Sequence, residues 1–330
     1  MKIVYLDTYP LGDISLEPIA CLGDFTGYAN TLPGEVIERA GEADVVIVNK
    51  VNITRKEIDA LPRLRLICVS ATGVNNVDTR YAARKGIPVK NVAGYSSGSV
   101  TETVLGMVLT LLRNLSYYDR YVKDGFYASS GLIFHMGRPV SEIRGKTWGI
   151  IGLGTIGHHV AEVARCLGAH VIYYSTSGTV REESYPLKTL ESLLSQSDIV
   201  SIHAPLNEKT KGLLGREQLS LMKSTAILIN VARGGIVDEK ALAEALDNGV
   251  IAGAGLDVFE HEPIDTDNPL LKIRNPDQLI LSPHSAWTSI QARKQLIEGV
   301  AQNIRDFLTD RAITGKKHAF PIKTTIKTKN

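Results

Sequence analysis

The chain has 330 residues, of which 44% are hydrophobic and 22% charged, and its formal net charge is +2. This length favours two domains, and the composition is that of a globular protein with large apolar cores. The small net charge argues against a nucleic-acid or membrane-surface partner, and no apolar run approaches the roughly 18 residues of a membrane span. The three cysteines lack metal-ligand spacing, and the first apolar run is too short for a secretory signal, so we expect a cytoplasmic protein.

Short apolar runs alternate with helical patterns along the chain, which predicts a parallel α/β architecture. In the first third, strands are expected at residues 3–6, 45–48 and 66–69. A capping box at 54–57 marks a helix between the last two of these strands. A second capping box at 99–102 opens a long apolar helix that should run to about residue 121. A helix of this kind must be covered on several sides, either by the core or by a second subunit.

A second block of alternating elements begins at residue 147. Its strands are expected at residues 147–151, 170–174, 199–203, 226–231, 252–257 and 278–281. Its helices are expected at residues 156–167, 187–195, 216–222 and 239–248, with a last helix from about 288 to 308. The final segment is rich in lysine, and we expect it to be a loosely held tail; its lysines are Lys316, Lys317, Lys323, Lys327 and Lys329.

A glycine-rich loop, Gly152-x-Gly154-x-x-Gly157, joins the first strand of this block to its first helix. The first glycine permits a tight turn, the second lets a pyrophosphate approach the backbone, and the third lets helix and strand pack closely. The helix N-terminus then offers N–H groups and a partial positive charge to the phosphates. The motif alone is weak, but its setting between a strand and a helix predicts a Rossmann dinucleotide site.

The acidic residue that an NAD site places after its second strand, to bind the adenosine ribose, is missing. Here Ser175, Thr176 and Ser177 follow Tyr174, and their hydroxyls could donate to a 2′-phosphate. Arg181 follows nearby, but no arginine comes directly after the strand. The cofactor is therefore expected to be NAD(H) or NADP(H), and the sequence does not choose between them.

Three residues of complementary chemistry follow predicted strands: Arg233, Glu262 and His284. A guanidinium can hold a carboxylate and polarise a carbonyl, a histidine can move a proton near neutral pH, and a carboxylate beside that histidine favours its charged form. These are the parts needed to reduce a 2-oxo acid, and they require no metal. Each residue alone would more often be structural. Their shared position with Asp257 at the carboxyl edge of a parallel sheet, where ligands bind, favours an active site.

The chain resembles the D-isomer-specific 2-hydroxyacid dehydrogenases over nearly its whole length. The resemblance rests on the glycine loop and on ATGVNNVD at 71–78, HAPL at 203–206, INVARGG at 229–235, GLDVF at 255–259, Glu262-Pro263 and Pro283-His284. It implies that Arg233 binds the substrate carboxylate, that His284 is the acid/base and that Glu262 keeps His284 protonated.

The resemblance also implies two Rossmann-like domains with parallel sheets. Residues 1–98 and 288–330 would form a discontinuous substrate domain, and residues 99–287 the inserted NAD(P)-binding domain. Two hinges would let the domains close, and the long helix from Ser99 would form a homodimer contact. The implied cofactor contacts are Gly152, Gly154, Thr155, Ile156, Gly157, Ser175, Thr176, His203, Ala204, Pro205, Val231, Ala232, Asp257 and Thr103. The implied substrate contacts are Asn49, Thr72, Gly73, Val74, Arg233, His284 and Trp287.

The implied activity is reversible hydride transfer between NAD(P)H and a small 2-oxo acid. With Trp287 three residues after His284, the chain resembles the branch of the family that acts on hydroxypyruvate and glyoxylate. The products would be D-glycerate and glycolate. Trp287 could also be a packing aromatic. A reductase forming D-lactate, or one acting on branched or aromatic 2-oxo acids, is an alternative. A nucleotide-sensing binding protein of the corepressor type is a weaker one. The physiological direction stays open.

Overall fold

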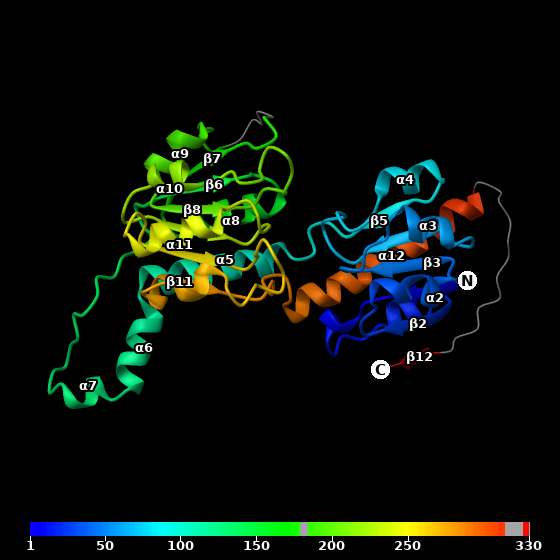
Figure 1. The fold of residues 1–330 in the computed structure, drawn as a ribbon, viewed down its shortest axis with the longest axis horizontal. Coiled ribbons are helices and arrows are strands. Elements are labelled where there is room, and N and C mark those ends of the chain that lie inside the picture. Colours follow the sequence, from blue (N-terminus) through cyan, green and yellow to red (C-terminus); the bar gives the residue numbers. More distant parts are fainter. Residues whose placement is uncertain (179–183, 314–325, 330) are drawn as a thin grey trace. The chain divides into compact units, whose positions relative to one another are not determined.

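The computed structural model describes residues 1–178, 184–313 and 326–329 (Figure 1). The chain forms two compact units, one of Met1–Ser96 with Thr288–Asn330 and the other of Ser97–Trp287. We call them unit 1 and unit 2. The first division lies two residues before the predicted one, because the helix that opens unit 2 already begins at Ser97.

Unit 1 is built on a six-stranded parallel sheet of order β12-β2-β1-β3-β4-β5. Its strands are β1 (Lys2–Tyr5), β2 (Asp24–Tyr28), β3 (Val45–Val48), β4 (Leu66–Val69), β5 (Val89–Asn91) and β12 (Ile326–Lys329). β3 and β4 are buried throughout, as expected for short apolar runs covered on both faces. The strand order reverses between β1 and β3. The expectation of a loosely held tail is wrong for residues 326–329, whose backbone pairs with β2; Lys316, Lys317 and Lys323 lie outside the described residues.

The helices of unit 1 are α1 (Glu17–Ala20), α2 (Val36–Ala40), α3 (Arg55–Ala60), α4 (Thr79–Arg84) and α12 (Ile290–Ile313). Side chains of α2, α3 and α4 share one apolar cluster with β1, β3 and β4. The predicted capping box opens α3, where Thr54 Oγ1 accepts from the N–H of Lys56 and the carboxylate of Glu57 accepts from the N–H of Thr54. At the start of α12 the capping side chain is Ser289, whose hydroxyl accepts from the N–H of Ala292.

Unit 2 has a second six-stranded parallel sheet, of order β11-β10-β9-β8-β6-β7. Its strands are β6 (Thr147–Ile151), β7 (His170–Tyr174), β8 (Ile199–Ile202), β9 (Ile227–Asn230), β10 (Gly253–Leu256) and β11 (Leu279–Leu281). The order reverses between β6 and β8, so both units have the same doubly wound pattern around their first strand. The predicted class, two Rossmann-like domains with parallel sheets, is confirmed.

Helices cover both faces of the unit 2 sheet. One apolar cluster joins the sheet to α5 (Ser97–Leu112) and α8 (Thr155–Cys166). The opposite cluster joins it to α9 (Leu190–Gln196), α10 (Arg216–Ser220) and α11 (Glu239–Asp247). In the part of the chain that the structure describes, no helix combines the length and apolar character needed to cross a bilayer.

The long apolar helix is shorter than predicted. α5 ends at Leu112, and the chain resumes as α6 (Leu115–Lys123). Between them Asn114 has a left-handed backbone with φ of 50°, a conformation that asparagine tolerates better than most residues. Its Nδ2 donates to the carbonyl of Pro139 at 2.8 Å, which fixes the break. A helix pattern read from apolar spacing could not reveal this interruption.

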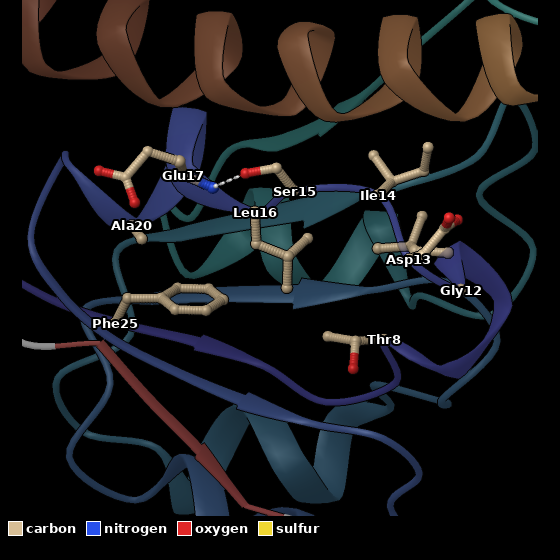
Figure 2. Close-up of a pocket in the computed structure, with 10 residues that line it drawn as sticks. Thr8, Gly12, Asp13, Ile14, Ser15, Leu16, Glu17, Ala20 and Phe25 are labelled. Atoms are coloured by element: carbon tan, nitrogen blue, oxygen red, sulfur yellow. Dashed lines mark hydrogen bonds between the residues drawn. The ribbon is translucent and has the colours of Figure 1, made fainter.

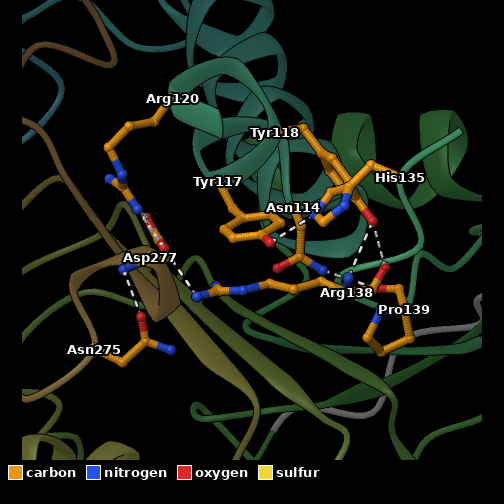
Figure 3. A network of polar contacts seen from close by, with 9 residues as sticks. All are labelled: Asn114, Tyr117, Tyr118, Arg120, His135, Arg138, Pro139, Asn275 and Asp277. Atoms are coloured by element: carbon orange, nitrogen blue, oxygen red, sulfur yellow. Dashed lines mark hydrogen bonds and ion pairs between the residues drawn. The ribbon is translucent and has the colours of Figure 1, made fainter. Parts of the chain in front are cut away.

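Residues 113–142 form an arm, containing α6 and α7 (Phe126–Ser129), that extends away from the sheet of unit 2 (Figure 1). The carboxylate of Asp277, which precedes β11, forms ion pairs with Arg120 at 2.6 Å and with Arg138 at 3.0 Å (Figure 3). Only 5% of the Asp277 side chain is exposed. Farther along the arm, the hydroxyl of Tyr117 lies 2.8 Å from Nε2 of His135. Two arginines of the arm are therefore held to the rest of unit 2 by one shared carboxylate, that of Asp277.

Candidate active site

The glycine loop lies at the carboxyl end of β6, where the strand order of unit 2 reverses. Gly152 has φ of 92°, and a Cβ atom there would lie 2.9 Å from the backbone nitrogen of Ala204. A Cβ atom on Gly157 would lie 2.3 Å from the carbonyl oxygen of Gly152, so α8 can approach β6 only without a side chain. The space beside Gly154 is open. This leaves room for phosphates at the first turn of α8.

A cavity of about 200 Å³ opens at this edge, lined by residues 152–154, 175–177 and 203–205. His203 contributes a ring whose Nε2 lies 3.0 Å from the hydroxyl of Ser201, which also accepts from the indole N–H of Trp148. Burial lowers the pKa of His203 to about 3, so the ring is neutral. Its Nδ1 is buried without a partner among the described residues. Open space beside a glycine and an unpaired polar atom fit a bound dinucleotide.

The end of the cavity that would take the adenosine ribose carries hydroxyls. Ser175 Oγ lies 3.2 Å from Ser177 Oγ, and no carboxylate or cationic side chain is among the described residues that line the cavity. Arg181, the cation that the sequence places nearby, lies outside the described residues. Among the described residues a ribose diol would meet neutral partners here, and none of them carries a negative charge that would repel a phosphate.

Arg233 follows β9 in a turn that Asn230 closes. Oδ1 of Asn230 accepts from the N–H of Ala232 at 3.1 Å, and its Nδ2 donates to the carbonyl of Arg233 at 2.9 Å. A Cβ atom on Gly234 would lie 1.8 Å from the carbonyl oxygen of Phe259, so this turn packs tightly on the next one. Nη1 of Arg233 donates to the carbonyl of Ala232, and in the described part of the chain no carboxylate pairs with the guanidinium. The remaining donors can bind a carboxylate in two-pronged fashion.

His284 and Glu262 are brought together although they are 22 residues apart, with Nδ1 of the imidazole 2.7 Å from Oε2 of the carboxylate. An ionised carboxylate only accepts, so Nδ1 carries a proton and Nε2 faces away from this bond. Oε1 of Glu262 accepts from the N–H of Phe259, which holds the carboxylate in place. His284 itself has φ of 53°, so its backbone is set by the surrounding loop.

Asp257 anchors the loop that carries His284. Its carboxylate accepts from the hydroxyl of Ser282 at 2.6 Å and from the N–H groups of Ser285 at 2.8 Å and Ala286 at 3.0 Å. Its carbonyl accepts from the N–H of His284. Burial raises the pKa of Asp257, and these hydrogen bonds oppose the rise. The cofactor contact implied for Asp257 stays a prediction, since its carboxylate is hydrogen-bonded within this loop.

Two other implied ligand residues of unit 2 have structural contacts. The hydroxyl of Thr103 donates to the carbonyl of Ser99 within α5. Trp287 packs against the apolar cluster beneath α5. Sequence reasoning missed Asn230 and Ser282, which shape the turns around Arg233 and His284. The signal that could have revealed them is their position, because Asn230 is the last residue of the apolar strand β9 and Ser282 directly follows β11.

Unit 1 carries the other implied substrate residues at the carboxyl ends of β3 and β4. The N–H groups of Gly73 and Val74 make no hydrogen bond within the described part of the chain. Asn49 Nδ2 donates to the carbonyl of Ser70, while its Oδ1 is buried and unpaired. Among the described residues, the buried side-chain atoms without a partner are Asn49 Oδ1, His203 Nδ1 and Thr101 Oγ1. Because buried polar atoms are normally paired, it is informative that two of these belong to residues expected to touch a ligand.

Unit 1 also has a hollow of about 340 Å³ beneath α12 (Figure 2). Leu16 and Phe25 form its apolar part, and Asp13 and Glu17 are on its exposed rim. Two carboxylates disfavour an anion, so this hollow does not suit a 2-oxo acid. Among the described residues no group of histidine, cysteine and acidic side chains is arranged to hold a metal ion.

Comparison with known proteins agrees with this geometry. Residues 105–286 match the family described as D-isomer specific 2-hydroxyacid dehydrogenase, NAD binding domain. The chain is 36% identical to a hydroxypyruvate reductase of Blautia hydrogenotrophica over 315 residues, which covers 93% of this chain and 97% of that protein. It is 37% identical to a glycerate dehydrogenase of Methylorubrum extorquens over 311 residues, covering 93% and 96% of the two chains.

A solved structure with a TM-score of 0.80 is the NADPH-dependent glyoxylate/hydroxypyruvate reductase of Sinorhizobium meliloti in complex with NADP and malonate; it is 28% identical, with 93% of each chain covered. The doubly wound unit with its glycine loop, the guanidinium of Arg233, which pairs with no carboxylate of the described residues, and the His284–Glu262 pair define an NAD(P)-dependent oxidoreductase acting on a CH–OH group. Within that class, the chain belongs to the D-isomer-specific 2-hydroxyacid dehydrogenases.

Proposed function

We propose that the protein reduces hydroxypyruvate to D-glycerate and glyoxylate to glycolate, reversibly, with a nicotinamide dinucleotide. The observation that carries this proposal is the 2.7 Å pair of His284 and Glu262 at the same sheet edge as the unpaired guanidinium of Arg233. The names of the two relatives that cover 93% of the chain support the choice of substrates.

In the reductive direction the 2-oxo carbon gains a hydride and its oxygen gains a proton. When bound, the reduced dinucleotide supplies the hydride. Arg233 binds the substrate carboxylate and stabilises the charge that develops on the carbonyl oxygen. His284 delivers the proton from Nε2, and Glu262 stabilises the charged imidazole before the transfer. In the oxidative direction Nε2 takes the proton back.

We further propose that the enzyme accepts both NADH and NADPH. The neutral hydroxyls of Ser175 and Ser177 neither repel nor strongly attract a 2′-phosphate, and no acid lines the described part of the cavity. The two reduced dinucleotides should therefore give values of kcat/KM within about tenfold of each other, a difference of about 1.4 kcal/mol in transition-state binding.

We also propose a homodimer formed through the arm. The apolar side chains near the end of the arm are strongly exposed; they are Leu132, Ile133, Phe134 and Met136. A monomeric protein rarely leaves such a patch in water, and a second copy of the chain would cover it. The contact predicted for the helix from Ser99 stays a prediction; most apolar side chains of α5 are buried within unit 2, whereas those near the end of the arm are exposed.

The test is a steady-state assay that follows loss of reduced-dinucleotide absorbance, with NADH and NADPH offered separately. The substrates are hydroxypyruvate, glyoxylate, pyruvate, 2-oxoisocaproate and phenylpyruvate, and His284→Asn is the inactive control. We expect the highest kcat/KM with hydroxypyruvate or glyoxylate. A clear preference for pyruvate or a bulkier acid would overturn the substrate choice. Dinucleotide binding without turnover of any of the acids would overturn the reductase proposal.

A further inference from the structure

The corner of unit 1 between β1 and β3 is filled by a side chain of the protein itself. The strand order reverses here, and in doubly wound sheets a ligand commonly binds outside the carboxyl ends of the strands at such a point. Asp7 follows β1 at this corner and is only 6% exposed. A buried carboxylate is uncommon unless it is paired or well hydrogen-bonded.

The partners of Asp7 are three successive backbone N–H groups of the loop after β3. Oδ1 accepts from Asn49 at 2.7 Å, and Oδ2 accepts from Lys50 at 2.5 Å and from Val51 at 3.0 Å. Successive N–H groups that converge in this way form a concavity suited to an anion. Burial raises the pKa of Asp7, while these hydrogen bonds favour its charged form. The anion in this concavity is thus the protein's own carboxylate.

The carbonyl groups of the same loop are held from the other side. Nδ2 of Asn76 donates to the carbonyl of Val51 at 2.9 Å and contacts that of Asn49 at 3.4 Å. Asn76 closes the segment that contains Gly73 and Val74, whose N–H groups are unpaired in the described part of the chain. The two segments of unit 1 that are expected to touch substrate are therefore one connected network.

We propose that Asp7 and Asn76 are positioning residues for the 2-oxo acid. The N–H groups of loop 49–51 donate to the carboxylate of Asp7, so they are not available to bind the substrate carboxylate. Through Asn76 the fixed loop holds the neighbouring segment in the conformation that leaves the N–H groups of Gly73 and Val74 available to the anion. This inference rests on the proposed function, since it assigns the residues a role in binding its substrate.

The test uses the full chain and the variants Asp7→Asn, Asp7→Ala and Asn76→Ala. Asn at position 7 keeps the shape but has one acceptor oxygen, so at least one of the three N–H groups loses its partner. We expect KM for the preferred 2-oxo acid to rise about tenfold or more, as for loss of one charge-assisted hydrogen bond, while kcat changes less than about threefold. The dissociation constant of the dinucleotide should stay unchanged, since its contacts are in unit 2. Asp24→Asn, an exposed aspartate at the start of β2, is the matched control.

A second measurement separates positioning from activity. Amide hydrogen exchange at residues 49–51 should be slow in the wild type, faster in Asp7→Asn and unaltered in Asp24→Asn. Unchanged KM in both Asp7→Asn and Asn76→Ala, despite faster exchange, would overturn the proposal. So would a parallel loss of kcat, substrate affinity and dinucleotide affinity, which indicates a general structural role. If the wild type turns over no 2-oxo acid, the proposed function fails, and the exchange data still report whether Asp7 holds the loop.

Discussion

The chemistry of this molecule depends on side-chain pairs that lie far apart in the sequence. Arg233, Glu262 and His284 could be predicted as a group because each follows a strand of one parallel sheet, and the structure places His284 on Glu262 at 2.7 Å. The contacts of Asp7 and Asp257 could not be predicted. Both carboxylates bind backbone N–H groups of loops, and the path of a loop is decided by tertiary packing rather than by its own residues.

Replacing Glu262 by Gln should shift the pH dependence of the reaction. Without the carboxylate, the charged imidazole of His284 is less stabilised, so reduction should decline at lower pH than in the wild type, and oxidation should extend to lower pH. At the upper end of the wild-type range, reduction should fall by about 10²-fold, the scale of general-acid catalysis. The measurement is kcat/KM against pH in both directions. Glu260→Gln, an exposed neighbour, is the control, and identical profiles for the two variants would contradict the assignment.

Replacing Ser175 by Asp should make the enzyme prefer NADH over NADPH. A carboxylate at this position can accept from the ribose diol and repels a 2′-phosphate. We expect kcat/KM with NADPH to fall at least about tenfold, while the value with NADH stays equal or rises. Ser195→Asp, an exposed serine on α9, is the control for added charge. Equal losses with both dinucleotides would place the ribose elsewhere.

His203 should make the folded protein sensitive to acid. Burial lowers its pKa from 6.5 to about 3, so the unfolded chain takes up a proton as the pH falls through 6.5 while the folded chain does not. Stability is therefore lost as the pH falls from 6.5 towards 3, by up to about 1.4 kcal/mol per pH unit. His203→Gln should remove this one-proton slope, measured by denaturant unfolding at several pH values. The slopes of the two proteins should coincide above pH about 7; equal slopes below pH about 6 would contradict the prediction.

At the scale of elements, the buried strands were the most predictable part of the fold. Continuous apolar runs predicted β3 and β4 with the bounds that the structure shows, because strands covered on both faces need such runs. β2 was missed because its sequence, DFTGY, contains a glycine and polar residues. β5 was missed because it is short and largely exposed. The break between α5 and α6 depends on one left-handed residue and its bond to a distant carbonyl.

Replacing Asn114 by Ala should loosen the arm and leave the sheet of unit 2 intact. Alanine disfavours the left-handed conformation by about 1–2 kcal/mol, and the bond to Pro139 contributes about 1 kcal/mol more. Asn114→Gly keeps the conformation but loses the bond, so its effect should be smaller. Limited proteolysis and hydrogen exchange of residues 113–142 measure the change. Equal protection of the arm in all three proteins would show that the break is fixed by other contacts.

At the scale of the whole molecule, one chain builds two units whose first five strands have the same order, while the sixth strand pairs at opposite edges of the two sheets: β12 beside β2, and β11 beside β10. The resemblance predicted this discontinuous arrangement, and a helix that follows a Rossmann block inside the chain is consistent with it. The arm stayed unpredicted, because its exposed apolar residues follow no helical stripe and their meaning depends on what covers them.

The homodimer proposal predicts a specific dissociation. The wild type should sediment as two chains, and the double change Ile133→Asp with Phe134→Asp should give single chains, because charges in an apolar interface are strongly unfavourable. Analytical ultracentrifugation over a range of concentrations measures the change. Tyr9→Asp, which alters an exposed aromatic of unit 1, should leave the association intact. A wild type that sediments as single chains at all concentrations would refute the proposal.

The two units differ at the point where the strand order of each sheet reverses, beside β1 in unit 1 and beside β6 in unit 2. In unit 2 a cavity lies at the corner beside the first strand, with open space at Gly154, whereas in unit 1 Asp7 occupies the corresponding corner. Asp7 therefore stands where a bound anion would be held, so the N–H groups at this corner of unit 1 are satisfied by the chain itself. That makes position 7 a starting point for engineering a second ligand site into the scaffold.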